Sequence, residues 1–207
     1  MIELFAPKNQ PSIAYAQYGD PHGYPLLIQH GLIASIEDGG LFDSLAGMGL
    51  RLICPARPGY GDSPPCRLGS YAEWAELLAP LLAALGLERF DLLGMSSGAP
   101  YAYAIAARYP RQARQVYIFS GLPALCDPAV RAAWPYPAPA ERSLPALQAL
   151  AWQLFFAGLS PAELERADLR DSARYEAFGV AQDLGLRFAD WGFPLKAVKQ
   201  RVFMRLS

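Results

Sequence analysis

A five-residue motif, Gly94-Met95-Ser96-Ser97-Gly98, constrains the fold of this chain more than any other feature. It follows an apolar run that ends at Leu93 and precedes residues 99–109, which have the pattern of a helix. Gly-x-Ser-x-Gly at a strand-to-helix junction is typical of a nucleophile elbow, a sharp turn that exposes the central serine at the top of a sheet. We therefore predict a strained backbone with positive φ at Ser96.

The rest of the N-terminal part alternates between strand and helix patterns. Strands are predicted at 2–6, 12–18, 25–30, 50–54, 89–94 and 115–120. Helices are predicted at 41–48, 71–85 and 97–109. For the second of these, Ser70 and Glu73 fit a capping box and Gly86 fits a C-terminal cap. Strands that alternate with helices indicate a mostly parallel sheet flanked by helices.

The pattern changes after Gly121. Prolines interrupt the chain, and three consecutive helices are predicted at 147–159, 161–168 and 174–188 without a strand between them. We predict three parts: a core over 1–121, a helical cap over 122–192, and a return to the core over 193–207 with a strand near 198–206.

Composition excludes several classes of protein. Hydrophobic residues make up 53% of the 207 residues and charged residues 18%, which excludes a disordered chain. The net charge is -1 and no basic run occurs, so we expect no nucleic-acid partner. The three cysteines fit neither a disulfide framework nor a zinc site, and Cys54 is expected to be buried. We expect no metal, no cofactor and no membrane span, and a cytoplasmic protein without a signal peptide.

Ser96 is the candidate nucleophile, and a serine needs a base to take its proton. The two histidines, His22 and His30, both precede it, and we favour a structural role over a general base for His30. The loop that begins there is expected to supply the Leu32 N–H to an oxyanion hole, together with the Ser97 N–H. Gly31 would let the backbone approach the reacting carbonyl. The Ser96 hydroxyl is expected to face a cavity between sheet and cap.

Two acidic residues and four aromatic residues are further candidates. Asp127 is placed as a possible triad acid, whereas for Asp62 we favour a carboxylate that caps its own loop over a catalytic acid. Four aromatic residues could line an acyl pocket or form the core of the cap: Trp134, Trp152, Phe155 and Phe156. The last three share one helical face. We favour the core of the cap over the acyl pocket for most of these residues.

Three motifs in order, His30-Gly31, then 57–63 (Arg-Pro-Gly-Tyr-Gly-Asp-Ser), then 94–98, resemble the α/β-hydrolase superfamily. The chain looks most like the capped branch with esterases, proline iminopeptidases and haloalkane dehalogenases. The resemblance implies the α/β-hydrolase fold, with the second strand antiparallel. A serine at the elbow implies hydrolysis of an ester, thioester or amide of a small acyl substrate.

The resemblance also implies a departure. Family members continue after the strand near 198–206 with an acid loop, a last strand, a histidine loop and a final helix, so this chain looks like a shortened member. Val202, Phe203, Met204 and Leu206 would then lie at an exposed sheet edge, where self-association is expected. Three functions stay open: a serine hydrolase that lacks its acid and base, a non-catalytic binder of a small ligand, and a degenerate fragment.

Overall fold

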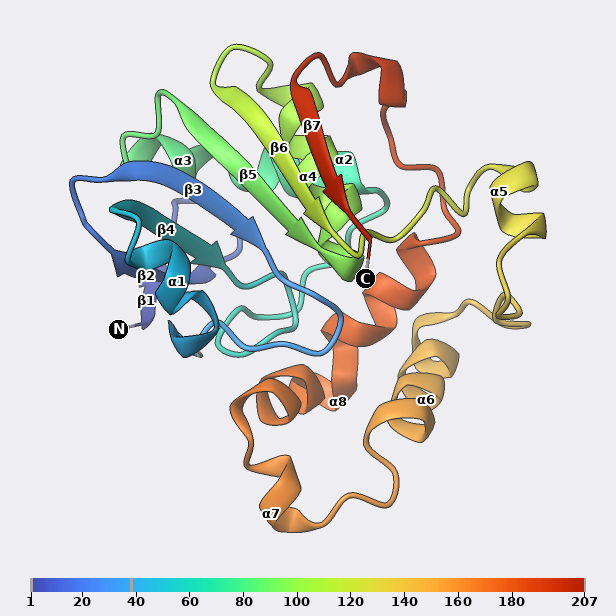
Figure 1. Ribbon diagram of the computed structural model, residues 1–207. Coiled ribbons are helices and arrows are strands. Elements are labelled where there is room, and N and C mark those ends of the chain that lie inside the picture. Colours follow the sequence, from blue (N-terminus) through green and yellow to red (C-terminus); the bar gives the residue numbers. More distant parts are fainter. Residues whose placement is uncertain (1, 38, 207) are drawn as a thin grey trace.

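Seven strands form one sheet in the computed structural model, which describes residues 2–37 and 39–206. The strand order is β1-β2-β4-β3-β5-β6-β7. The strands are β1 (Ile2–Phe5), β2 (Ile13–Gly19), β3 (Tyr24–Gln29), β4 (Leu50–Pro55), β5 (Phe90–Met95), β6 (Ala113–Phe119) and β7 (Arg201–Arg205). As predicted, β2 runs antiparallel to its neighbours, whereas β4, β3, β5, β6 and β7 pair in parallel. The carboxyl ends of the parallel strands therefore meet at one edge of the sheet (Figure 1).

Helices lie on both faces of this sheet. One face is covered by α2 (Tyr71–Leu77), α3 (Ala79–Ala84) and α4 (Ala99–Arg108) (Figure 1). The other carries η1 (Gly39–Phe42) and α1 (Asp43–Ala46), which contacts β4 and β2. Because α1 is short, this face keeps an open apolar hollow of about 660 Å³ that side chains such as Leu93 and Phe119 line.

The prediction of one helix over 71–85 with a capping box is wrong in two details. The helix is divided at Leu78 into α2 and α3, and Pro80 has no N–H to donate to the Glu76 carbonyl. The predicted capping box is absent, because the Ser70 side chain makes no cap hydrogen bond, and the Glu73 carboxylate instead accepts from the Gly69 N–H at 2.8 Å. Gly86 does end the segment, with the expected positive φ of 66°.

Four helices between β6 and β7 form a layer beyond the carboxyl ends of the strands (Figure 1), which we call the helical layer. They are α5 (Pro128–Ala132), α6 (Leu144–Phe155), α7 (Pro161–Leu164) and α8 (Ala167–Leu186). The helix predicted at 174–188 is wrong at its start: α8 already begins at Ala167 and is interrupted at 174–177, where the backbone angles are not helical. Tyr175 and Glu176 have left-handed φ angles of 52° and 58° there, and their carbonyls accept from Gln148 Nε2 of α6 at 3.2 and 3.1 Å.

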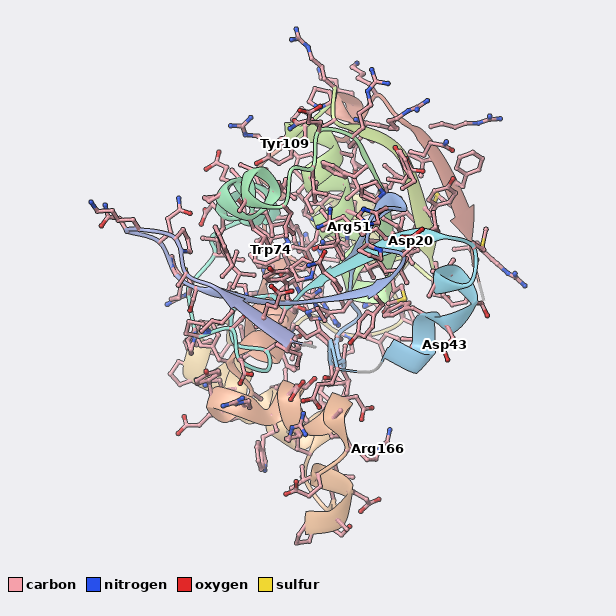
Figure 2. The ribbon with its side chains drawn as sticks, turned by 90° about the vertical axis from the view of Figure 1, so that its left-hand side faces the viewer. Asp20, Asp43, Arg51, Trp74, Tyr109 and Arg166 are labelled. Carbon is pink, nitrogen blue, oxygen red and sulfur yellow. The ribbon has the colours of Figure 1, made fainter. Side chains whose placement is uncertain are left out.

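The helical layer shares a hydrophobic core with the sheet. Leu147 and Ala151 of α6 and Val180 of α8 are buried in one cluster with Leu26 and Ile28 of β3. The layer nevertheless extends far from the sheet, since Arg166 and Tyr109 lie at opposite ends of the molecule (Figure 2). None of the helices in residues 2–37 and 39–206 is long and apolar enough to cross a membrane.

The last strand is an exposed edge of the sheet, as expected. The exposed fraction is 36% for Val202, 38% for Phe203, 61% for Met204 and 75% for Leu206, which follows the strand. Phe203 stacks on Tyr117 of β6, with ring centroids 5.2 Å apart. Cys54, in contrast, is buried as predicted.

Candidate active site

The predicted elbow is present between β5 and α4. Ser96 has a φ of 49°, as predicted, and its side chain is exposed. Gly98 sits so close to β3 that a Cβ there would lie 2.1 Å from the Gln29 carbonyl oxygen, so only glycine fits. The Leu122 N–H donates to the Ser96 carbonyl at 3.0 Å and ties the loop after β6 to the elbow.

The predicted oxyanion loop passes beside the elbow. A Cβ on Gly31 would lie 3.9 Å from the Ser96 Cβ, so residue 31 neighbours the serine. Within the described part of the chain, the N–H groups of Leu32 and Ser97 donate no hydrogen bond to a protein acceptor. Their role as oxyanion donors stays a prediction.

His30 is engaged in structural hydrogen bonds. Its Nδ1 lies 2.9 Å from the Gly31 carbonyl, and its Nε2 accepts from the Arg57 N–H at 3.3 Å. Burial and the Arg57 charge hold the pKa of His30 well below its ordinary value, although the Gly31 hydrogen bond opposes them. His30 is therefore neutral, with both ring nitrogens in use, as the structural interpretation requires.

His22 lies at the other end of the sheet. It belongs to the turn between β2 and β3, next to the amino end of β3, and its N–H donates to the Asp20 carboxylate. Ser96 follows the carboxyl end of β5, which runs parallel to β3. His22 and Ser96 therefore lie at opposite ends of these strands.

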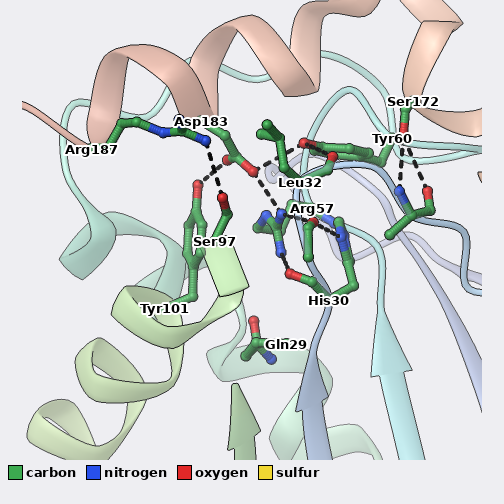
Figure 3. Close-up of polar contacts among 12 residues, drawn as sticks. Gln29, His30, Leu32, Arg57, Tyr60, Ser97, Tyr101, Ser172, Asp183 and Arg187 are labelled. Atoms are coloured by element: carbon green, nitrogen blue, oxygen red, sulfur yellow. Dashed lines mark hydrogen bonds and ion pairs between the residues drawn. The ribbon is translucent and has the colours of Figure 1, made fainter. Parts of the chain in front are cut away.

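A buried ionic network lies beneath the helical layer, and the sequence interpretation missed it. The Asp183 carboxylate of α8 accepts from Arg57 Nη2 at 2.6 Å, from the Tyr60 hydroxyl at 3.0 Å and from the Tyr101 hydroxyl at 2.5 Å (Figure 3). Arg57 also donates to the carbonyl oxygens of His30 at 2.6 Å and Gly31 at 2.8 Å. The network therefore fixes the backbone beside Ser96 to α8.

The charges of this network are matched. Burial alone would lower the pKa of Arg57, but the Asp183 carboxylate raises it above its ordinary value, so the guanidinium stays charged. Burial, and then the Asp183 charge, raise the pKa of Tyr60 and Tyr101 well above the ordinary value. Both hydroxyls therefore remain protonated donors to one buried carboxylate.

A second arginine of α8 reaches the elbow. Arg187, the C-cap residue of α8, donates from Nη2 to Ser97 Oγ at 3.2 Å (Figure 3). It also lines a cavity of about 740 Å³ within the helical layer. Ser96 is exposed and does not line this cavity. That its hydroxyl faces a cavity between sheet and cap stays a prediction.

The four aromatic residues predicted for the pocket lie in three different environments. Trp134 and Phe155 line the cavity. Phe156 is buried in the core shared by sheet and helices, and Trp152 is 43% exposed on the outer side of α6. Helical spacing predicted that Trp152, Phe155 and Phe156 share one face. It could not show that these three side chains have different surroundings: solvent, the cavity and the core.

The two candidate acids have other partners. Asp127 is the N-cap of α5, where its carboxylate accepts from the Ala129 N–H at 2.8 Å and the Val130 N–H at 3.3 Å. Asp62 does not cap its own loop, as the favoured interpretation proposed, but forms an ion pair with Arg174 at the kink of α8. Within residues 2–37 and 39–206, no group of three His, Cys, Asp or Glu residues is arranged to hold a metal ion.

Comparison with known proteins agrees with this geometry. The family model described as alpha/beta hydrolase fold matches residues 24–176, which is most of the chain. The chain belongs to the alpha/beta hydrolase family.

Two curated hydrolases are similar to this alpha/beta hydrolase over about half of its length. A 2-hydroxymuconate semialdehyde hydrolase from Pseudomonas putida is 31% identical over 104 residues, which are 48% of this chain and 37% of that protein. An uncharacterized hydrolase from Bacillus subtilis is 27% identical over 100 residues, which are 48% of this chain and 35% of that protein. The matched segment thus spans little more than a third of either relative.

Solved structures share the fold at low sequence identity. A probable hydrolytic enzyme from Pseudomonas aeruginosa has a TM-score of 0.70 and 21% identity, covering 99% of this chain and 72% of that one. An enol-lactonase from Burkholderia xenovorans has a TM-score of 0.69 and 17% identity, covering 98% and 80%. These similarities concern the alpha/beta hydrolase fold alone.

The sequence interpretation gave no role to five residues of the site: Arg57, Tyr60, Tyr101, Asp183 and Arg187. Two of them, Arg57 and Tyr60, stand in the motif 57–63, but only as part of the resemblance. One signal was available for Asp183. It stands in the run 177–186, in which every residue except Gln182 and Asp183 is apolar or glycine. An acid in an apolar helical run is rarely left unpaired, but nothing in the sequence named Arg57 as its partner.

Proposed function

We propose that this alpha/beta hydrolase acts as a serine hydrolase on an ester, thioester or amide of a small substrate. The observation that carries the proposal is the exposed Ser96 at a φ of 49°, at the elbow beside Gly31. Ser96 Oγ would attack the acyl carbonyl and lose its proton to water, and the alcohol, thiol or amine would leave with a proton from solvent. Water would then hydrolyse the acyl-enzyme and release the acid and free Ser96. The N–H groups of Leu32 and Ser97 would hold the oxyanion.

This reaction needs a base for the Ser96 proton, and neither histidine is available for that role. The ring of His30 is occupied on both nitrogens, and His22 belongs to the opposite end of the sheet. We therefore expect the 207-residue chain to hydrolyse acyl substrates slowly. Hydrolases without their triad retain on the order of 10³–10⁴-fold acceleration over water, from oxyanion hole and binding.

Labelling with a fluorophosphonate, read by peptide mass spectrometry, tests the nucleophile. We expect one slow adduct, located on Ser96, that is lost in Ser96→Ala and retained in the matched control Ser97→Ala. An adduct on another serine, or none after prolonged incubation, would refute the assignment. Fast p-nitrophenyl acetate turnover that Ser96→Ala abolishes would instead refute the lack of a base.

A second candidate function is the binding of a small ligand without turnover. The apolar cavity of about 740 Å³ in the helical layer favours it. Native mass spectrometry of the purified protein tests this candidate, because a co-purifying small molecule together with an unreactive Ser96 would support binding over catalysis.

A further inference from the structure

The cation at the C-terminal end of α8 lies next to the proposed nucleophile. Arg187 Nη2 bonds to the hydroxyl of Ser97, the residue that follows Ser96. Figure 3 shows the side chain extending from α8 toward the start of α4. A group held by Arg187 would therefore be held within reach of the elbow.

The charge of Arg187 has no partner of opposite sign within residues 2–37 and 39–206. The nearest acid along the helix is Asp183, one turn earlier, and both of its oxygens accept from other groups, namely Arg57, Tyr60 and Tyr101. Arg187 forms no ion pair among the described residues, and its buried Nε makes no hydrogen bond there. A half-buried guanidinium with free donors is stabilised by a bound anion.

The same side chain lines the apolar cavity of the helical layer. Leu150, Phe155, Leu184 and Phe188 are among the apolar residues around it. The other charged lining residue is Glu141, which is exposed and accepts from the Ser143 hydroxyl at 2.5 Å. The cavity thus combines an apolar wall with one cation that also touches the elbow.

We propose that Arg187 is a carboxylate-binding residue, and that this site takes acyl compounds with an apolar body and a free carboxylate. The guanidinium would hold the carboxylate through paired N–H donors, and the cavity would hold the hydrocarbon part. The orientation of the substrate's ester or amide toward Ser96 rests on the proposed function, whereas the binding of the carboxylate does not.

Binding of octanoate and octanamide tests this proposal without catalysis. The two ligands have the same apolar chain and differ in charge. Calorimetry should show octanoate binding at least about tenfold more tightly than octanamide, since hydrogen bonds to charged groups contribute on the order of ten- to a hundredfold in affinity. Equal affinities, or no binding of either ligand, would overturn the proposal, and this result needs no variant protein.

Variants then assign the preference to one residue. Arg187→Gln should abolish the preference for octanoate, and Arg187→Lys should restore part of it. The matched control Arg131→Gln removes an exposed arginine of α5 and should keep the preference. A preference that persists in Arg187→Gln would refute the role of Arg187. Fluorophosphonate labelling reads the nucleophile and octanoate binding reads the carboxylate site, so a failed nucleophile assignment and a failed carboxylate site give different results.

Discussion

Arg57 and Asp183 form an ion pair of 2.6 Å across 126 positions of sequence, with side chains only 1% and 3% exposed. This pair joins the loop after β4 to α8, and thereby joins the sheet to the helical layer. Through its other donors, Arg57 also holds the backbone at residues 30 and 31, beside the elbow. The position of the layer and the shape of the candidate site therefore depend on the same contact.

Asp183→Asn should lower the free energy of unfolding by about 3–5 kcal/mol, because it leaves the buried Arg57 charge without compensation. Urea denaturation followed by circular dichroism measures this change. The matched control Asp168→Asn breaks an exposed pair with Arg166, with side chains 37% and 65% exposed, and should change stability by less than about 1 kcal/mol. Equal effects of both substitutions would contradict the role assigned to the network.

Stability should fall as the pH drops below the ordinary His pKa of 6.5, because burial holds the pKa of His30 well below that value in the folded protein. Below this pH, His30 binds a proton in the unfolded chain but not in the folded chain. The contribution of neutral His30 to the free energy of unfolding is therefore fully present above pH 6.5 and is lost as the pH falls below it. The loss approaches about 1.4 kcal/mol per pH unit, and carboxylates add to it only below about pH 5.

Thermal unfolding of His30→Gln between pH 7 and pH 5 checks this contribution. The variant should show a flatter pH dependence than the parent protein, whatever its absolute stability. His22→Gln removes an exposed imidazole and should keep the parental slope. An NMR titration that shows the His30 ring protonating at its ordinary pKa would contradict the prediction.

Gly98→Ala should disrupt the elbow, because its Cβ would lie 2.1 Å from the Gln29 carbonyl oxygen and 2.6 Å from that of His30. Backbone atoms cannot yield as a flexible side chain does, so we expect a loss of about 3 kcal/mol or more and no labelling of Ser96. Gly47→Ala serves as the control, since its Cβ would meet nothing closer than 3.4 Å. Normal melting of Gly98→Ala would show that the turn is less constrained than its geometry indicates.

We propose that the chain associates with a second copy through the exposed edge strand β7. In an antiparallel pair centred on Phe203, Arg201 would face Arg205 of the other copy, and like charges directly opposite are destabilising. Added salt should therefore strengthen association, by screening this repulsion while the apolar contacts remain. Sedimentation velocity at low and high salt measures it.

Met204→Lys should weaken that association, since it adds charge to the edge and removes an apolar side chain that is 61% exposed. Met48→Lys changes a methionine outside the edge strand that is even more exposed, at 71%, and should leave association unchanged. A monomer at all protein and salt concentrations would remove the proposal.

The elbow and most of the strands could be predicted from the sequence, because each depends on neighbours in the chain. The antiparallel direction of β2 followed only from the resemblance to the α/β-hydrolase superfamily. The run 90–95 is apolar enough to be a central strand, and the glycines at 94 and 98 permit the close approach that the turn requires. The structural role of His30 could also be inferred, since a strand end that enters a loop is well placed for backbone hydrogen bonds.

Tertiary structure alone decided the partners of the charged residues. Asp183 and Arg57 meet only because α8 returns over the carboxyl ends of β3 and β5, and pairing over 126 positions leaves no local pattern. The same return places Arg187 beside Ser97, turns Asp62 toward Arg174, and leaves Asp127 to cap α5. The sequence determines the chemistry of each side chain. Its partner is selected by the free energy of burial, because a buried charge must be paired, and burial depends on the packing of segments that are distant in the sequence.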